Sequence, residues 1–143
     1  MSFQAKNPDF VRAVHDSFNA QAFMHNLNAE VTKVGPGSCE IQMPFDKKWT
    51  QQNGFFHAGI VSTIADNAAG YAGYSLMEKG SSVLTTEFKL NLLSPGDGEM
   101  LIGRGHVLKY GKTLTVCRAE VFVVKNGVEK MCAASQATLI ELK

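Results

Sequence analysis

The sequence predicts an α+β fold in which an antiparallel sheet wraps around one long central helix. Residues 54–77 contain no lysine or arginine, and their apolar residues recur at the spacing of a buried helix. The second half of the chain consists of alternating apolar and polar stretches separated by turns, which is typical of antiparallel strands. Because a single apolar helix must be covered on most sides, a sheet that wraps around it is the simplest arrangement.

Each element is predicted from a local pattern. Asn7-Pro8-Asp9 resembles a helix start, and apolar residues follow it at helical spacing, so we expect an amphipathic helix over 7–24 that breaks near Asn19. A polar loop over 46–53 precedes the central helix, and Gly80-Ser81 ends it. Short hairpins such as Asn126-Gly127 are expected to join the last four strands, which makes them antiparallel. Strands are expected at residues 27–34, 39–45, 85–92, 100–110, 113–124 and 128–142.

Length and composition narrow the function. The 143 residues fit one domain over 1–143, with a helical segment at 1–25, and 45% of them are hydrophobic. A net charge of +1 does not favour a nucleic-acid surface. The absence of a membrane-length apolar run and of a signal-peptide pattern predicts a protein without membrane association. No clustered metal ligands or Gly-x-Gly-x-x-Gly motif are present, so neither a metal nor a separate cofactor is expected.

Three cysteines indicate the compartment. Cys39, Cys117 and Cys132 form no Cys-x-x-Cys pair, and all three fall in strand-like stretches. An odd number of thiols without a paired motif predicts buried, reduced cysteines. Such thiols are typical of a cytoplasmic protein.

One face of the central helix is made of small and polar residues. Each glycine there costs the helix roughly 1 kcal/mol relative to alanine, so we expect another backbone or a ligand to come close. Asp66 is the acid on this face, and burial without a local cation suits a general base or nucleophile. A satisfied structural acid is the alternative. The residues of this face are Gly59, Ser62, Thr63, Asp66, Gly70 and Gly73.

The start of the same helix offers a complementary group. His57, Ala58 and Gly59 lie where free backbone N–H groups and the helix dipole make an oxyanion site. His57 either stabilises the turn or helps to polarise a carbonyl. Ala58 and Asp66 are eight residues apart, which is about 12 Å along a helix, so they cannot act on one carbonyl carbon. If both take part in one reaction, a second subunit must supply the acid, and this predicts a homodimer with two shared sites.

A basic turn is the remaining candidate. Lys109-Tyr110-Gly111-Lys112-Thr113 places two lysines beside a glycine whose backbone a phosphate can approach. Taken alone, the turn is more simply explained as a solvated hairpin.

Together these residues resemble a known family. The segment QQNGFFHAGIVSTIADNAAGYAGY is similar to the central-helix motif of hotdog-fold acyl-CoA thioesterases of the phenylacetate-degradation (PaaI-like) type, and the likeness extends through TTEFKLNLLSPG and KYGKTLTVCRAEVF. It covers roughly residues 27–140. One departure is Ala58, which stands where the family has glycine. Alanine keeps the N–H but narrows the approach by one methyl group and disfavours positive φ.

The resemblance implies a hotdog fold and hydrolysis of acyl-CoA. Asp66 would be the base or nucleophile, and the Ala58 N–H would polarise the thioester carbonyl. Gln51 and His57 would position the carbonyl or the attacking water, and Thr85 would orient Asp66 or water. The turn formed by Lys109, Gly111, Lys112 and Thr113 would bind the CoA nucleotide, which is part of the substrate.

Two other functions stay open on the sequence alone. A hotdog enoyl-thioester hydratase or dehydratase needs a histidine and an acid converging on the acyl chain, although the nine residues from His57 to Asp66 are short for that branch. A non-catalytic acyl-CoA-binding module is the other alternative. The acyl group, the role of Asp66 as nucleophile or base, and the choice between a homodimer and a homotetramer built as a dimer of dimers also stay open.

Overall fold

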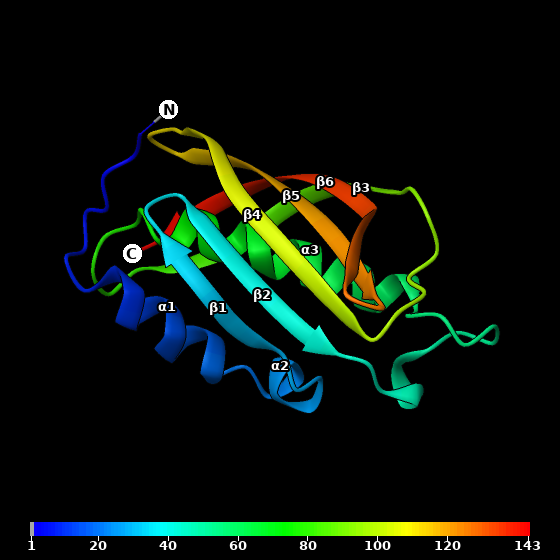
Figure 1. Ribbon diagram of the computed structural model, residues 1–143. Helices are drawn as coiled ribbons and strands as arrows, with labels where there is room; N and C mark the ends of the chain where they lie inside the picture. The colour runs from blue at the N-terminus through cyan, green and yellow to red at the C-terminus, as the bar shows by residue number, and fades with distance from the viewer. Residues whose placement is uncertain (1) are drawn as a thin grey trace.

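The computed structural model describes residues 2–143 and shows a six-stranded antiparallel sheet curled around the long helix α3, Ala58–Tyr74 (Figure 1). The order of strands across the sheet is β1-β2-β4-β5-β6-β3. This arrangement confirms the predicted α+β class with a central helix. The strands are β1 Glu30–Gly35, β2 Ser38–Pro44, β3 Ser82–Leu92, β4 Met100–Tyr110, β5 Leu114–Lys125 and β6 Val128–Leu142.

Helix α3 packs closely on the middle of the sheet. Two glycines of β4 allow this approach, because a Cβ at Gly105 would collide with the Ala68 carbonyl oxygen and one at Gly103 would meet Ile64. The apolar stripe predicted for the helix is buried throughout, as the chemistry of a covered helix requires. Its residues are Ile60, Val61, Ile64, Ala65, Ala68, Ala69 and Ala72.

The position of β3 differs from the prediction. Hairpins were expected to link all of the last four strands, but β3 pairs with β6 and not with its successor β4. Residues 93–99 carry the chain past β6 and β5, about 14 Å at the usual strand spacing, because those two strands fill the space between. One edge of β3 is therefore left without a strand partner. Three apolar side chains of this strand are exposed, namely Leu84 (52%), Phe88 (44%) and Leu92 (55%).

The N-terminal segment also departs from the expected boundaries. The helix expected over 7–24 is two helices, α1 Phe10–Asn19 and α2 Ala22–Asn26. Strand β1 begins at Glu30 rather than at residue 27, because Leu27 ends α2 as a buried anchor and Asn28 adopts a left-handed conformation with φ of 51°. The apolar side chain of Leu27 therefore belongs to the end of α2 and not, as predicted, to the strand β1.

The central helix is shorter than the stretch that predicted it. Residues 54–57 form a loop, with Gly54 at φ of 83°, and the helix ends at Tyr74 rather than at Gly80-Ser81. Ser75 lies at its C-terminus, where its hydroxyl donates to the Ala72 carbonyl at 2.7 Å and accepts from the Gly37 N–H. The short helix η1, Lys47–Trp49, lies within the loop expected over 46–53.

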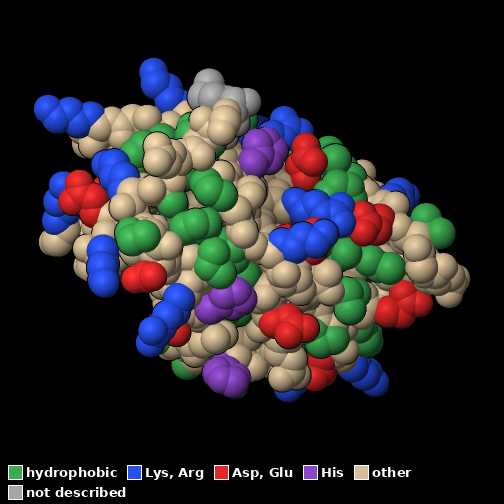
Figure 2. Space-filling view, turned by 60° about the vertical axis from the view of Figure 1, so that its left-hand side comes forward, with side chains coloured by type: hydrophobic (Ala, Val, Ile, Leu, Met, Phe, Trp, Pro, Cys, Tyr) green, Lys and Arg blue, Asp and Glu red, His purple; other side chains and the backbone are tan. Residues whose placement is uncertain are grey.

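The sheet face turned away from α3 carries a charged network. Glu40, which is 8% exposed, accepts hydrogen bonds from Arg104 and Thr32, both at 2.8 Å. Arg104 also forms a two-pronged pair with Glu129. Burial alone raises the pKa of Glu40, but the hydrogen bonds from Arg104 and Thr32 outweigh it and leave this pKa below its ordinary value. Basic and acidic side chains lie next to one another across the face shown in Figure 2.

The prediction of buried, reduced thiols is confirmed. Cys39, Cys117 and Cys132 are all free and buried. Burial raises their pKa values, to about 12 for Cys39 and Cys117 and to about 11 for Cys132, so the thiols stay protonated and unreactive. Among residues 2–143, no helix is long and apolar enough to cross a membrane.

Candidate active site

The N-terminus of α3 leaves one backbone N–H unused. His57 is the N-cap, and its Nδ1 accepts from the Gly59 N–H at 2.8 Å. The N–H groups of Ile60 and Val61 donate to the His57 carbonyl oxygen. Of the four N–H groups in the first turn, only that of Ala58 has no acceptor within residues 2–143. This exposed donor lies at the positive end of the helix dipole, where it can stabilise an oxyanion.

The hydrogen bond from the Gly59 N–H also determines the tautomer of the neutral His57 ring. A nitrogen that accepts from an N–H carries no proton, so the neutral ring holds its proton on Nε2. His57 is exposed, and its Nε2–H is therefore available as a second donor beside Ala58. The residue caps the helix and offers a hydrogen bond at the same time.

Gln51 organises the loop that leads into the helix. Its side-chain oxygen accepts from the backbone N–H groups of Asn53 and Phe55, and its own N–H donates to the Phe55 carbonyl. Because the oxygen is engaged in the loop, the amide nitrogen is the free end of the side chain, and it has no acceptor in the described part of the chain. Gln51 thus offers a third donor near the start of α3.

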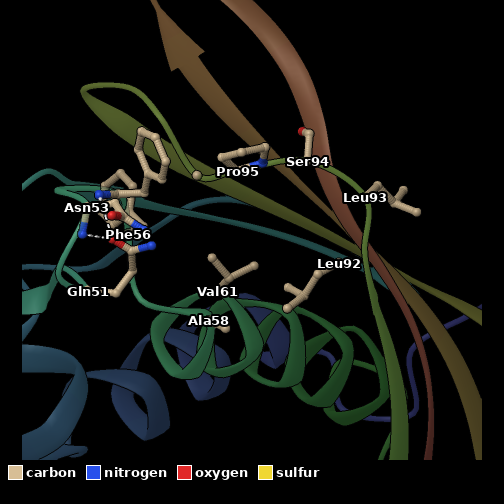
Figure 3. Close-up of a pocket in the computed structure, with 11 residues that line it drawn as sticks. Gln51, Asn53, Phe56, Ala58, Val61, Leu92, Leu93, Ser94 and Pro95 are labelled. Carbon is tan, nitrogen blue, oxygen red and sulfur yellow. Dashed lines mark hydrogen bonds between the residues drawn. The ribbon is translucent and has the colours of Figure 1, made fainter.

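Gln51 and Ala58 border a cavity of about 490 Å³, the Ala58 cavity (Figure 3), whereas His57 lines a separate cavity of about 370 Å³ together with Gly59 and Ile60. Ala58 and Val61 line the Ala58 cavity from the helix, Gln51 from the preceding loop, and Leu92 from the end of β3. The remaining walls come from residues 93–96 and from Asn53, Phe55 and Phe56. The cavity therefore joins a free N–H to a largely apolar enclosure.

Asp66 lies in a different cavity. The half-buried carboxylate accepts a hydrogen bond from the Thr85 hydroxyl at 2.7 Å. Its second oxygen has no donor, and the side chain has no ion pair, among residues 2–143. A cavity of about 230 Å³, the Asp66 cavity, is lined by Gln21, Asp66, Asn67, Gly70, Tyr71, Val83, Leu84 and Thr85.

The two cavities share no residue. Ala58 and Asp66 are about 12 Å apart along the helix, and their side chains and N–H groups serve different spaces. One chain therefore holds two half-sites, one with the oxyanion donor and one with the carboxylate.

The glycines of α3 play three different roles. Gly73 packs against Leu139 on β6, so it lies on the sheet side and not on the open face where it was expected. Gly59 sits against the His57 ring. Gly70, one turn after Asp66, has open space where a side chain would be, and it widens the Asp66 cavity. Close approach therefore explains Gly73, whereas Gly70 leaves room.

Ser62 and Thr63 are occupied within the helix. Both hydroxyl groups donate to the Gly59 carbonyl oxygen at 2.9 Å. Such bonds to the preceding turn are common for helical serine and threonine. Neither residue lines the Ala58 cavity or the Asp66 cavity.

The basic turn lies at the Asp66 end of the sheet. Tyr110 pairs with Thr115, Thr115 with Leu139, and Leu139 with Thr85, so the turn and Thr85 share one row of the sheet. Three strand spacings separate them, about 14 Å. Lys109, Lys112 and Thr113 are exposed, and the Gly111 N–H donates to the Leu114 carbonyl.

Some residues that line the Asp66 cavity could not be identified as site residues from a sequence motif. Gln21 comes from the junction between α1 and α2, and Tyr71 and Asn67 from α3, yet they meet beside Asp66. Tyr71 belongs to the core, with 6% exposure, and also lines the Asp66 cavity. Gln21 stands in no recognisable motif, so only the fold could bring it to the site.

Known proteins place the chain in a family. The model of the thioesterase superfamily matches residues 53–130. The crystal structure of a thioesterase family protein from Silicibacter pomeroyi is 47% identical, covers 93% of this chain and 98% of its own, and superposes with a TM-score of 0.91. The E. coli PaaI protein is 18% identical, with 97% of each chain covered and a TM-score of 0.84. Human acyl-coenzyme A thioesterase 13 is 29% identical over 59% of this chain and 60% of its own.

The chain belongs to the thioesterase superfamily, and its fold is the hotdog fold. Both confirm the family and fold expected from the central helix. The matched residues include Ala58, Asp66 and Thr85.

Proposed function

We propose that this protein hydrolyses acyl-CoA thioesters to a free acid and CoA. The observation that carries the proposal is the pair of uncommitted groups on α3, namely the Ala58 N–H and one oxygen of the Asp66 carboxylate. The likeness to human acyl-coenzyme A thioesterase 13 supports CoA as the thiol. CoA belongs to the substrate, and the chemistry asks for no further cofactor.

Each step of the hydrolysis has a group to serve it. The thioester oxygen accepts from the Ala58 N–H, with the side-chain nitrogen of Gln51 and Nε2 of His57 positioning the carbonyl or the water. Asp66, oriented by Thr85, takes a proton from the attacking water or attacks the carbonyl carbon itself. A new carbon–oxygen bond forms, the carbon–sulfur bond breaks, and the thiolate leaves with the electron pair. If Asp66 is the nucleophile, the product of this step is an anhydride with Asp66, which a water molecule then cleaves to release the free acid and restore the carboxylate.

The edge of β3 explains how the two half-sites come together. An exposed edge with apolar side chains invites a second strand. If two copies of β3 pair antiparallel about a two-fold axis near Phe88, the end of one strand that carries Thr85 lies beside the end of the other that carries Leu92. This pairing sets the Asp66 cavity, which Thr85 lines, beside the second copy's Ala58 cavity, which Leu92 lines. The proposal is therefore a homodimer with two shared sites.

The proposal extends to the CoA nucleotide, to the assembly of the chains and to the cellular compartment. The turn at Lys109, Gly111, Lys112 and Thr113 lies on the Asp66 side and would bind the CoA nucleotide, its lysines facing the phosphates. Exposed apolar side chains elsewhere, such as Leu114 (49%), supply surface for a dimer of dimers. The free thiols support a cytoplasmic location.

The test is release of free thiol from a panel of aromatic and aliphatic acyl-CoAs. Asp66→Asn keeps the size of the side chain but removes its basicity, and we expect it to retain the fold while losing most turnover. Asp16→Asn, at an exposed position on α1, is the matched control and should behave as wild type. Full activity of the Asp66→Asn protein would exclude the proposed role, and loss of an enoyl-CoA absorbance without thiol release would indicate a hydratase.

A further inference from the structure

The Asp66 cavity has a polar wall that hydrolysis itself does not use. Gln21, at the junction of α1 and α2, reaches across to α3, where its side-chain nitrogen lies 2.9 Å from Asn67 Oδ1 and 2.8 Å from the Tyr71 hydroxyl. All three residues line the cavity that also holds Asp66 and Thr85. The proposed mechanism assigns no step to them.

Chemistry dictates the direction of the hydrogen bonds that hold Gln21 in this wall. Asn67 donates its side-chain nitrogen to the Thr63 carbonyl oxygen, which can only accept. Asn67 therefore turns its amide oxygen to Gln21, and Gln21 must present its nitrogen. The second hydrogen of that nitrogen goes to the Tyr71 hydroxyl oxygen, which also lies 3.1 Å from Ser17 Oγ.

One hydrogen-bonding group of Gln21, its amide oxygen, has no partner in this arrangement. Both amide hydrogens of Gln21 are used, whereas its amide oxygen has no donor within residues 2–143. The oxygen cannot exchange places with the nitrogen, because Asn67 would then face it with a second acceptor. Gln21 thus lines the cavity and carries a free hydrogen-bond acceptor, while two bonds to α3 hold its side chain.

We infer that Gln21 is a specificity-determining residue whose amide oxygen accepts a hydrogen bond from a hydroxyl or N–H group carried by the acyl chain. The inference rests on the proposed thioesterase activity and names the class of acyl group. An apolar acyl group would displace water from the oxygen and leave it unpaired, and a site built to pair a polar group discriminates strongly against an analogue that lacks it.

The size of the cavity agrees with this assignment. Its volume of about 230 Å³ is below the roughly 300–1,000 Å³ of a pocket that holds a whole ligand, as expected for a pocket that holds one part of a substrate. Gly70 contributes open space beside Asp66. An acyl group seated there has the reacting carboxylate and Gln21 on walls of the same cavity.

The test compares matched substrates. Each ω-hydroxyacyl-CoA in a series of chain lengths is paired with its deoxy analogue and with its methyl ether, which keeps the oxygen but has no hydrogen to donate. For wild type at the best-fitting length, we expect kcat/KM about tenfold higher for the hydroxylated substrate than for either analogue, the worth of one hydrogen bond. Gln21→Met, which keeps the side-chain length, should bring the ratio close to one.

Two control variants distinguish substrate selection by the Gln21 oxygen from a general effect of substitution on the site. Tyr71→Phe removes the tyrosine hydroxyl but leaves Gln21 tied to Asn67, so the preference should persist even if overall turnover changes. Gln4→Met, at an exposed site, should change neither quantity. Equal hydrolysis of all three substrate types by wild type, or a preference that survives Gln21→Met, would overturn the inference while the thioesterase function stands. No hydrolysis of any substrate would remove both.

Discussion

Replacing Ala58 by proline removes the backbone N–H from the proposed site and puts the ring carbon Cδ in its place, while the helix itself loses no hydrogen bond. Proline is well accepted at the first position of a helix, where its fixed φ fits and its missing N–H breaks no intrahelical bond. The Ala58 N–H has no acceptor within residues 2–143. The preceding residue must be extended, and His57 already is, with φ of −61° and ψ of 139°. The helix should therefore form normally in Ala58→Pro.

The expected loss follows from the role of the donor. Removing one oxyanion-hole donor lowers kcat by roughly 100- to 1,000-fold, which corresponds to about 2.7–4 kcal/mol. The assay is kcat for thiol release, measured together with the thermal unfolding midpoint and with binding of free CoA. Ala58→Gly keeps the N–H and serves as the matched control, with activity expected within a few-fold of wild type. A proline variant that folds and retains near wild-type kcat would refute the oxyanion role of this N–H.

The same variant tests whether two chains share each site. Subunits of Ala58→Pro and Asp66→Asn are each nearly inactive, but a mixed dimer contains one site with both groups intact. If the chains reassort at random, half of the dimers are mixed and half of their sites work, so the mixture should recover about a quarter of wild-type activity. A mixture that is verified to contain mixed dimers yet stays inactive would show that each chain builds its own site.

Two further outcomes are expected. Thr85→Val removes the hydroxyl that donates to the Asp66 carboxylate at 2.7 Å. Since a hydrogen bond to a charged group contributes about 1.5–3 kcal/mol, we expect kcat to fall at least about tenfold while KM changes little. A variant with wild-type kcat would contradict this role of Thr85. The lowered pKa of Glu40 means that its ionised form stabilises the fold above the ordinary carboxyl pKa and that this contribution is lost as pH falls through the lowered value. Urea unfolding between about pH 5 and pH 3 should therefore show a smaller acid loss in Glu40→Gln than in wild type, and equal losses would argue against the paired carboxylate.

Much of the fold was predictable because its signals are local. The stripe from Ile60 to Ala72 has helical periodicity whatever surrounds it, and all of it is buried. Alternation gave the strands at 100–110 and 128–142 with the boundaries that the structure has. Prediction was wrong where one residue fits two elements, as with Leu27, whose apolar side chain anchors a helix end and not a strand.

The candidate site was predictable in its chemistry but not in its partners. Ala58 at a helix start and Asp66 eight residues later are properties of the sequence, and helical rise alone separates them. That Thr85 reaches Asp66 and that Gln21 lies in the same cavity depends on where β3 and the α1–α2 junction dock. These contacts span 19 and 46 residues or more along the chain, beyond the reach of any local pattern.

The sequence by itself therefore determined a buried helix with a donor at its start and an acid in its middle, because periodicity and helix geometry act over a few residues. Only the tertiary structure decided that β3 lies at the edge beside β6, with β5 and β6 between it and β4. That placement leaves one edge of β3 without a strand partner within residues 2–143, and it brings Leu92 to the cavity of the donor and Thr85 to the cavity of the acid. The free energy that decides it comes from packing between segments far apart in the chain, which no single segment encodes.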